Sequence, residues 1–205
     1  MRVLVACEFS GIVRDAFLAL NHDAVSCDLL QTEMQGPHIR GDVKEVLHDG
    51  WDLMIAHPPC TFLCNSGVRW LYNGSKKDSH RWAGLETAAK FFNILLTAPI
   101  PMIAVENPIM HSYGRFRVDR NHDQIIHPWQ FGHEETKSTC LWLSGLDQLR
   151  PTDIVGPPPS KRADRKSWEK CHRASRSLNR WKDRSRTMKG IASAMAEQWG
   201  TMQVV

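Results

Sequence analysis

The sequence lacks an apolar run long enough to cross a membrane. Its longest such run, residues 91–100, falls well short of the ~20 residues that a membrane-spanning helix needs. The chain also begins without a secretory signal, because a single basic residue is followed by an acidic one at Glu8 and no small-residue cleavage site is present. We therefore expect a cytoplasmic protein with no membrane partner.

The six cysteines lack both the regular spacing of a disulfide framework and the tight C-x-x-C pairs of zinc sites. In a chain long enough to bury its own core, they are typical of reduced thiols. His57, Cys60 and Cys64 have spacings that zinc could use, but without C-x-x-C pairs we predict no metal.

Basic residues are few outside one segment. Residues 160–189 contain twelve Lys and Arg against three Asp and Glu, a net charge of +9, whereas the rest of the chain carries −5. This asymmetry favours a polyanionic partner. We expect one α/β body, residues 1–155 and 185–205, with residues 156–184 as a basic Trp- and Arg-rich segment that follows a proline-rich linker.

Apolar runs alternate with stretches of helical spacing. Strands are expected at 3–7, 24–27, 51–56, 101–105 and 139–143, helices at 12–20, 82–96 and 188–199, and a long polar loop at 61–81. This alternation predicts an α/β fold, a doubly wound, mostly parallel sheet with helices on both faces.

The residues most suited to chemistry follow the expected strands. They are Glu8 to Gly11, Asp28, Asp42, Pro58 to Cys60, and Glu106 to Pro108. Because ligands of such sheets bind beyond the carboxyl ends of the strands, we expect these residues to share one site.

The first two strand ends favour a nucleoside. Gly11 allows close approach of the backbone to a ligand, and an acid such as Asp28 can bind ribose hydroxyls. No G-x-G-x-x-G follows the first strand, which disfavours a dinucleotide. The alternative is that Gly11 only makes a tight turn and Asp28 only caps a strand.

Cys60 and Glu106 form a possible reactive pair. Two prolines hold Cys60 just past a buried strand, and Glu106 ends a neighbouring one. A thiolate beside a carboxylic acid suits covalent attack on a polar heteroaromatic ring. A lone buried cysteine would be structural, and the pairing with Glu106 favours the reactive interpretation.

The order of these motifs resembles that of the DNA cytosine-5 methyltransferases, and more closely that of their small phage-associated relatives. The resemblance covers about residues 3–60, 101–110, 135–145 and 184–199, and Pro58-Pro59-Cys60 followed by Glu106-Asn107 is its most specific part. It implies a class I methyltransferase fold that uses S-adenosylmethionine.

The resemblance also implies roles for individual residues. Cys60 corresponds to the nucleophile that adds to C6 of cytosine, Glu106 to the acid at N3 and N4, and Lys137 to the one cation kept from a Gln-x-Arg-x-Arg segment. The residues that it assigns to the cofactor are Glu8, Phe9, Ser10, Gly11, Asp28, Asp42, Val43 and Pro58.

Two departures from the family leave alternatives open. Val13 stands where a glycine is usual, and the nearby Arg14 could bind a carboxylated sulfonium that transfers a larger group such as carboxymethyl. The target-recognition domain is also absent. A second alternative is therefore an enzyme acting on free cytosine nucleotides, and a third is a non-catalytic DNA-binding decoy.

In place of a recognition domain we expect cations and tryptophans to bind DNA, with short or relaxed sequence specificity. The residues expected to do so are Arg69, Arg173, Arg176, Arg180, Trp181 and Arg184. The basic segment argues against a mononucleotide substrate, and Cys60 with Glu106 argues against a decoy.

Overall fold

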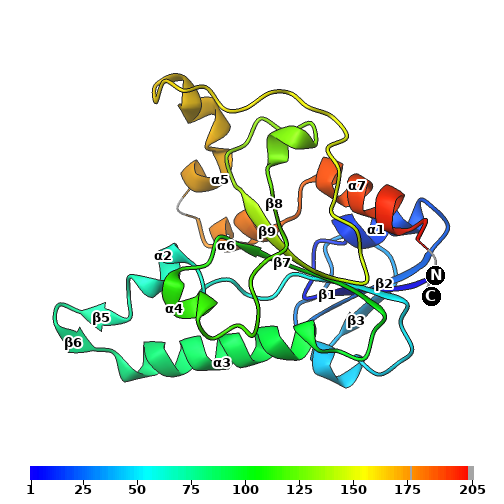
Figure 1. Cartoon of the computed structure of the whole chain (residues 1–205), viewed down its shortest axis with the longest axis horizontal. Coiled ribbons are helices and arrows are strands. Elements are labelled where there is room, and N and C mark those ends of the chain that lie inside the picture. Colours follow the sequence, from blue (N-terminus) through cyan, green and yellow to red (C-terminus); the bar gives the residue numbers. More distant parts are fainter. Residues whose placement is uncertain (176, 203–205) are drawn as a thin grey trace.

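The computed structural model describes residues 1–175 and 177–202, which fold around one seven-stranded sheet (Figure 1). The strand order is β3-β2-β1-β4-β7-β9-β8. The strands are β1 (Arg2–Ala6), β2 (Asp23–Asp28), β3 (His38–Arg40), β4 (Leu53–Ala56), β7 (Met102–Pro108), β8 (Gln124–Ile126) and β9 (Thr139–Ser144).

The sheet is mixed but mostly parallel. Strands β3, β2, β1, β4 and β7 run parallel, whereas β9 is antiparallel to both β7 and β8. The predicted α/β fold with a doubly wound, mostly parallel sheet is confirmed. Strands β3 and β8 were not predicted, because each spans three residues and only one of those six residues is fully buried.

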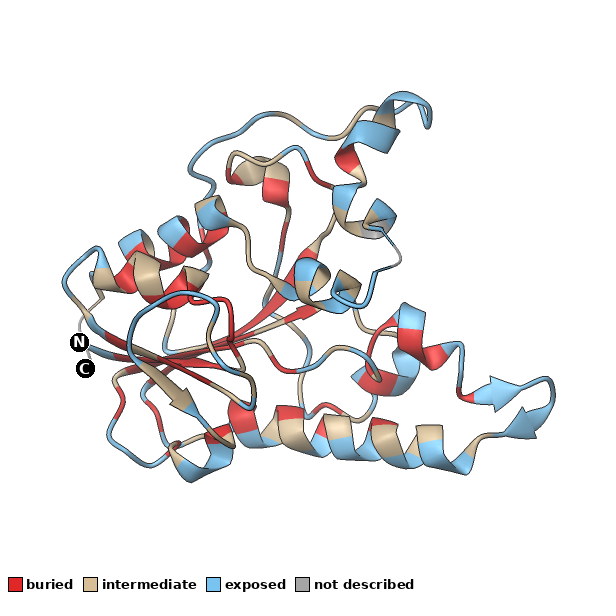
Figure 2. Ribbon diagram, turned by 180° about the vertical axis from the view of Figure 1, so that it is seen from behind, coloured by how far each residue is buried: buried red, intermediate tan, exposed pale blue. Residues whose placement is uncertain are grey.

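Helices cover both faces of the sheet (Figure 2). The α-helices are α1 (Ile12–Leu18), α2 (Asn65–Val68), α3 (Ser79–Leu96), α4 (Ser112–Arg115), α5 (Lys170–Arg173), α6 (Arg180–Ser185) and α7 (Lys189–Trp199). Helices α1 and α7 pack together on one face, and α3 lies on the other. Within the part of the chain described, no helix could span a membrane.

Side chains alternate between the two faces along each strand, as the pleat requires. In β1, Leu4 belongs to the core under α3, whereas Val5 belongs to the core under α1 and α7. In β7, Met102 and Ala104 face α1 and α7. The same alternation places Glu106 on the α7 side of the sheet.

The prediction of a long loop at residues 61–81 is wrong, because this segment contains helix α2 and a hairpin formed by β5 (Tyr72–Asn73) and β6 (Lys76–Lys77). The hairpin projects from the body as an arm beyond α2 (Figure 1). All four of its strand residues are exposed, so it leaves no hydrophobic pattern in the sequence.

Candidate active site

The residues singled out from the sequence meet at the carboxyl edge of the sheet. Ala6 of β1 pairs with Cys27 of β2 and with Ala56 of β4, and Ala56 pairs with Val105 of β7. Strands β1 and β4 therefore end at the same level, β2 ends one residue later, and β7 passes this level at Val105 and continues to Pro108 beside β9. The segments that follow them carry the predicted nucleoside and reactive residues, as expected for an α/β sheet.

The reactive half of this edge brings Cys60, Glu106 and Lys137 together. The Asn107 side chain, which is fully buried, donates from Nδ2 to the Pro58 carbonyl at 3.5 Å, which ties the end of β7 to the segment that carries Cys60. Cys60 is partly exposed, and the charges of both Glu106 and Lys137 act on its pKa. The three residues predicted to be catalytic therefore lie close enough for their charges to interact.

A second thiol, missed in the sequence, lies beside Cys60. The Cys60 thiol donates a hydrogen bond to Cys64, which together with Ser66 lowers the pKa of Cys64 to about 5. The same interaction, burial and Glu106 raise the pKa of Cys60 above its ordinary value. The two thiols therefore interact, and Cys64 is the more acidic of the two.

Glu106 is held as a carboxylate. Burial raises its pKa, but hydrogen bonds from His57 and Thr139 and the charge of Lys137 outweigh burial, so the pKa lies below its usual value. The Nδ1 atom of His57 donates to Oε2 of Glu106 at 3.4 Å. His57 was considered in the sequence only as a metal ligand. The position of His57 directly before two prolines at a strand end was the feature of the sequence that could have indicated a role beside Glu106.

Two polar atoms near this pair are buried without a partner among the residues described. They are His57 Nε2 and Asn107 Oδ1. Nδ1 carries the hydrogen of the bond that it donates to Glu106. Nε2 is therefore an acceptor in the neutral ring and a donor in the imidazolium. Buried atoms of this kind are costly unless a ligand or water satisfies them, so they mark where a substrate would bind.

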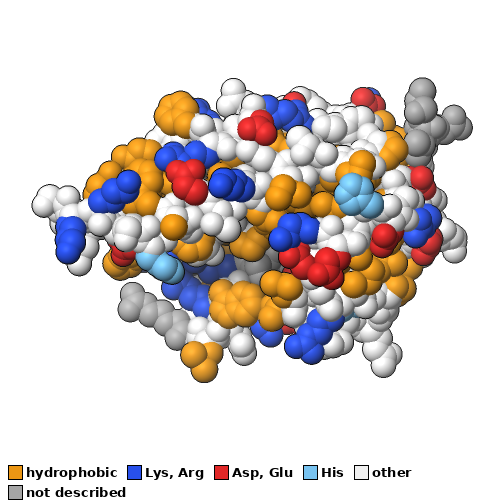
Figure 3. Space-filling view, turned by 90° about the horizontal axis from the view of Figure 1, so that it is seen from below, with side chains coloured by type: hydrophobic (Ala, Val, Ile, Leu, Met, Phe, Trp, Pro, Cys, Tyr) orange, Lys and Arg blue, Asp and Glu red, His pale blue; other side chains and the backbone are white. Residues whose placement is uncertain are grey.

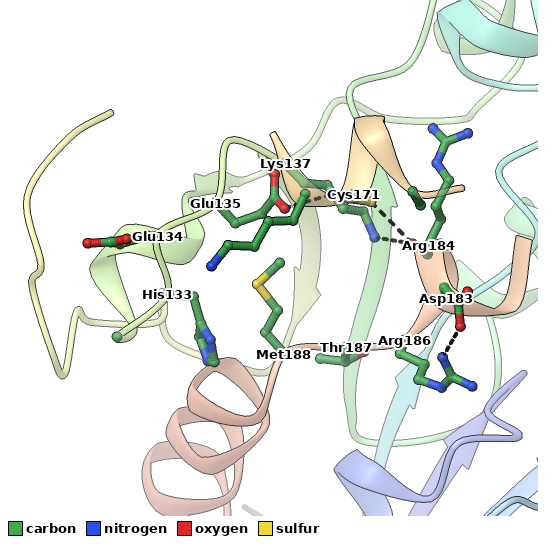
Figure 4. A pocket seen from close by; sticks show the side chains of 13 residues that line it. His133, Glu134, Glu135, Lys137, Cys171, Asp183, Arg184, Arg186, Thr187 and Met188 are labelled. Carbon is green, nitrogen blue, oxygen red and sulfur yellow. Dashed lines mark hydrogen bonds and ion pairs between the residues drawn. The ribbon is translucent and has the colours of Figure 1, made fainter. Parts of the chain in front are cut away.

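A cavity of about 520 Å³ adjoins Lys137 on the α7 side, between the 132–137 loop and the basic segment. Figure 4 shows Lys137 and Cys171 both directed at the backbone of Arg184, whose carbonyl accepts from Lys137 Nζ at 3.0 Å. A smaller cavity beside it is lined by Glu106, Lys137 and Thr139. The reactive carboxylate and the cavity are therefore neighbours.

The other half of this edge, called the nucleoside half here, carries the residues predicted to bind a nucleoside. Its buried polar groups bind other parts of the chain. Glu8, which is buried, accepts from the backbone N–H of Val13 at 2.8 Å and of Arg14 at 3.3 Å, and from the Ser10 hydroxyl at 2.9 Å. Its carboxylate therefore satisfies the N-terminus of α1 and shapes the loop. Glu8 and Ser10 can therefore contribute to ligand binding only by fixing the conformation of this loop.

Arg14 is not available to a carboxylated sulfonium, which corrects the expectation from the sequence. Its side chain is fully buried and pairs with Asp15 at 2.7 Å. The same guanidinium donates to the hydroxyls of Ser26 and Thr32 and to the carbonyls of Met34 and Gln35. Gly11, with φ +76°, passes so close that a Cβ would lie 2.5 Å from this guanidinium. Arg14 is a structural anchor for the loop after β2.

Of the remaining residues predicted to bind a nucleoside, Asp28 and Asp42 keep partial exposure, whereas Val43 does not. Asp28 ends β2, accepts from the Leu30 N–H at 2.9 Å, and has a pKa raised by burial. Asp42 caps the short turn that follows β3 and pairs with Lys44 at 2.9 Å, while Val43 is buried in the core. A half-buried acid at the end of β2 fits the hydroxyls of a ribose.

The basic segment covers the first of these loops. Trp181 of α6 lies against Phe9 with ring centroids 5.9 Å apart. Arg186 makes two hydrogen bonds of 2.8 Å to Glu33, which lowers the pKa of Glu33. The side chain of Trp181, predicted to bind nucleic acid, thus packs in part on the predicted cofactor loop.

The other residues predicted to bind nucleic acid are dispersed. Arg173 pairs with Glu169 at 2.9 Å, and Arg69 lies over the ring of Trp70, on the arm side of the molecule. Arg180 begins α6, and the guanidinium of Arg184 points away from the cavity in Figure 4. Arg176 lies outside the described residues.

Neither metal nor disulfide chemistry has support in the described part of the chain. There, no group of three or more His, Cys, Asp or Glu side chains could hold a metal ion. All six cysteines are free thiols.

Comparisons with known proteins give little at the level of sequence. No family model and no curated protein matches the chain, so the sequence comparisons do not confirm a family. Among solved structures, the chain is similar to a candidate DNA modification methyltransferase encoded within an E. coli prophage, with a TM-score of 0.49 and 16% identity. That match covers 80% of this chain and 54% of the other, so this chain spans about half its length.

Proposed function

We propose that this protein transfers a methyl group from S-adenosylmethionine to C5 of cytosine in DNA. One observation carries the proposal: a partly exposed thiol, a carboxylate and an ammonium group, on Cys60, Glu106 and Lys137, act on one another at the carboxyl edge of the sheet. A nucleophile beside an acid is the arrangement that covalent activation of a cytosine ring needs.

The chain's own groups account for the activation. As the Cys60 Sγ–C6 bond forms, the thiol proton passes to Cys64, the electron pair of the C5–C6 double bond forms a C4–C5 double bond, and the electron pair of the C4–N3 double bond moves to N3. Glu106 delivers the proton that N3 takes up, and because Glu106 is a carboxylate in the free protein, it first takes this proton from solvent. Lys137 offsets the negative charge that gathers around Sγ and the carboxylate. Once C5 carries the methyl group, water takes the C5 proton, the electron pair of the C5–H bond restores the C5–C6 double bond, and Sγ leaves as a thiolate that regains its proton from Cys64. N3 returns its proton to Glu106.

The nucleoside half fits the cofactor in its donor set. Asp28 would hold the ribose hydroxyls, Phe9 and Val43 would contact the apolar surface of the adenosine, and Asp42 would contact the adenine. S-adenosylmethionine supplies, when bound, the methyl group on a sulfonium that a nucleophilic carbon can attack. Trp181, packed on Phe9, would exclude water from this side.

Trapping with 5-fluorocytosine DNA tests the proposal, because fluorine at C5 blocks the last step and leaves the protein attached. With S-adenosylmethionine present, we expect wild-type protein to form a denaturation-resistant adduct. Cys60→Ser should form none. Cys27→Ser is the matched control, since that thiol is buried in β2 and its donation to the Gly41 carbonyl can be kept by a hydroxyl.

Three outcomes would overturn the proposal. They are no adduct with wild-type protein on single-stranded or duplex DNA, an adduct that survives Cys60→Ser, and an adduct with 5-fluoro-dCMP but none with DNA. Asp28→Ala should weaken binding of S-adenosylmethionine by about tenfold, the loss of roughly one charge-assisted hydrogen bond, as measured by calorimetry. Unchanged affinity would remove Asp28 from the site.

A further inference from the structure

A row of aromatic rings runs from the arm to helix α4. Tyr72 of β5 meets Trp82 of α3 edge-on at 5.8 Å, Trp82 meets Tyr113 of α4 at 5.3 Å, and Tyr113 meets His111 at 5.0 Å. Tyr72 is 44% exposed and Tyr113 36%. Two further rings are near the row in the sequence: Trp70, before β5, is 57% exposed, and Phe116, directly after α4, is 75% exposed. We call these six residues the arm surface.

Four cations lie against these rings, and of these only Arg117, which is 5.3 Å from the Trp82 ring, pairs with a carboxylate among the described residues. Arg69 lies over Trp70 at 4.7 Å, Lys77 over Trp82 at 4.6 Å, and Arg115 over Phe116 at 5.4 Å. The nearby acids have other partners: Asp78 accepts from the Arg81 backbone, and Glu86 pairs with Arg117. The arm surface is therefore both aromatic and basic, and exposed aromatic clusters of this kind mark interaction sites.

The arm surface leads to the reactive thiols. Helix α4 is joined to the turn of Cys60 and Cys64 by a β-bridge between Cys64 and Met110, and by the His111 N–H, which donates to the Leu63 carbonyl at 2.9 Å. A Cβ on Gly114 would lie 2.8 Å from that carbonyl, so α4 and the turn are in direct contact. Figure 3 shows a hollow with Lys and Arg side chains inside it, on the half of the molecule where the arm lies.

We infer that the arm surface binds single-stranded DNA, with bases stacked on its rings, and guides a cytosine to Cys60. This inference rests on the proposed function, because it names the form of DNA that the same site would receive. Exposed rings interleaved with Lys and Arg are the usual means of holding unpaired bases and their phosphates.

Duplex DNA fits this surface poorly. Reading a major groove takes a helix or a two-stranded ribbon that can enter it, whereas α2 and α4 have four residues each and the strands of the arm have two. A duplex would also have to lose a base pair before its cytosine could reach the Cys60 thiol. An unpaired strand needs no such step.

The test measures binding apart from chemistry. Cys60→Ser protein, without cofactor, is titrated against a fluorescent cytosine-containing oligonucleotide as a single strand, as a duplex and as RNA. We expect at least about tenfold tighter binding of the single DNA strand than of the duplex. Adding Trp70→Ala and Phe116→Ala should weaken single-strand binding by about tenfold or more, since each removed ring takes away one stacking contact.

Matched controls separate stacking from general effects. Ile154→Ala removes a side chain of similar exposure (64%) on another surface and should leave affinity unchanged. Lys76→Gln with Lys77→Gln should lower the salt dependence of binding, whereas Lys90→Gln, on the exposed side of α3, should not. Melting temperatures show whether each variant is folded, and the double ring variant changes only residues that are mostly exposed.

Equal or tighter binding of duplex or RNA would overturn the inference, as would a double ring variant that is folded and binds the single strand like its parent. These results are independent of trapping. An adduct without single-strand preference leaves the proposed function standing and removes this inference. Single-strand binding that depends on the rings, without any adduct, would support this inference and overturn the proposed function.

Discussion

The two halves of the candidate site differ in what their polar groups do. Around β1 and β2, buried polar side chains bind the chain itself: Glu8 accepts three hydrogen bonds from its own loop, and Arg14 donates to five neighbouring residues. Around β4 and β7, His57 Nε2 and Asn107 Oδ1 are buried without a partner in the described residues. Glu8 and Arg14 in the first half thus have no capacity left for a ligand, whereas two buried polar atoms of the second half do.

This difference shows where to look for chemistry. In a sequence, a charged residue beside a glycine turn suggests a role in ligand binding. When the structure buries that residue with a full set of hydrogen-bond partners, its role is structural. Unsatisfied buried atoms beside a nucleophile are better evidence, because folding alone does not account for them. The comparison can be tested by removing one residue from each half.

The largest effect is expected in the first half. Arg14→Met removes a fully buried guanidinium and leaves Asp15 and two carbonyls without their donor, so the free energy of unfolding should fall by about 3–5 kcal/mol. Urea unfolding measures the change. Arg40→Met, at an exposed arginine of the neighbouring strand β3, should change it by less than about 0.5 kcal/mol. A loss below about 1 kcal/mol in Arg14→Met would mean that Arg14 does not anchor the loop.

Much of this site could be predicted from the sequence, and the limits are physical. Strand ends are marked by apolar runs that stop at Asp28, Pro58 and Glu106, and a parallel sheet brings such ends to one edge. That is why the pairing of Cys60 with Glu106 could be predicted. The burial of Arg14 could not, because its partners include backbone carbonyls, which leave no trace in the sequence.

The interactions of Cys64 with Cys60 and of His57 with Glu106 could have been predicted from the sequence. Cys64 follows Cys60 by four residues, and its N–H bonds the Cys60 carbonyl at 3.2 Å in a helical turn that brings the side chains together. The polar composition of residues 61–81 concealed this turn. The same composition concealed the arm, whose rings are exposed or half-buried and show no period of burial.

A smaller effect is expected at His57. His57→Leu removes a hydrogen bond to a carboxylate, which should lower the free energy of unfolding at pH 7 by about 1–2 kcal/mol. The folded-state pKa of Glu106 lies below its usual value of 4.5, so ionised Glu106 stabilises the fold above that value and loses this contribution as the pH falls through the folded-state pKa. The difference between wild type and variant should therefore be largest at pH 7 and shrink toward pH 4.

Urea unfolding at several pH values checks this dependence, and the ¹³C shift of the Glu106 carboxyl carbon reports its pKa directly. In the variant, burial is opposed only by Thr139 and Lys137, so the pKa of Glu106 should rise. His48→Leu, at an exposed histidine, is the control and should change neither measurement. A stability difference that does not vary with pH would show that His57 contributes by packing alone.

The smallest effect is expected at Cys64 and concerns reactivity. Interactions with Cys60 and Ser66 lower the pKa of Cys64 to about 5, so iodoacetamide should alkylate the pair rapidly at pH 7. In Cys64→Ala, burial and Glu106 keep the pKa of Cys60 high, and the summed alkylation at residues 60 and 64 should slow by at least about tenfold. Peptide mass spectrometry follows each thiol, with Cys171→Ala as the control. If Cys60 reacts as fast without Cys64 as with it, then the second thiol does not take the proton, and the reactive half relies on Lys137 alone to favour the thiolate.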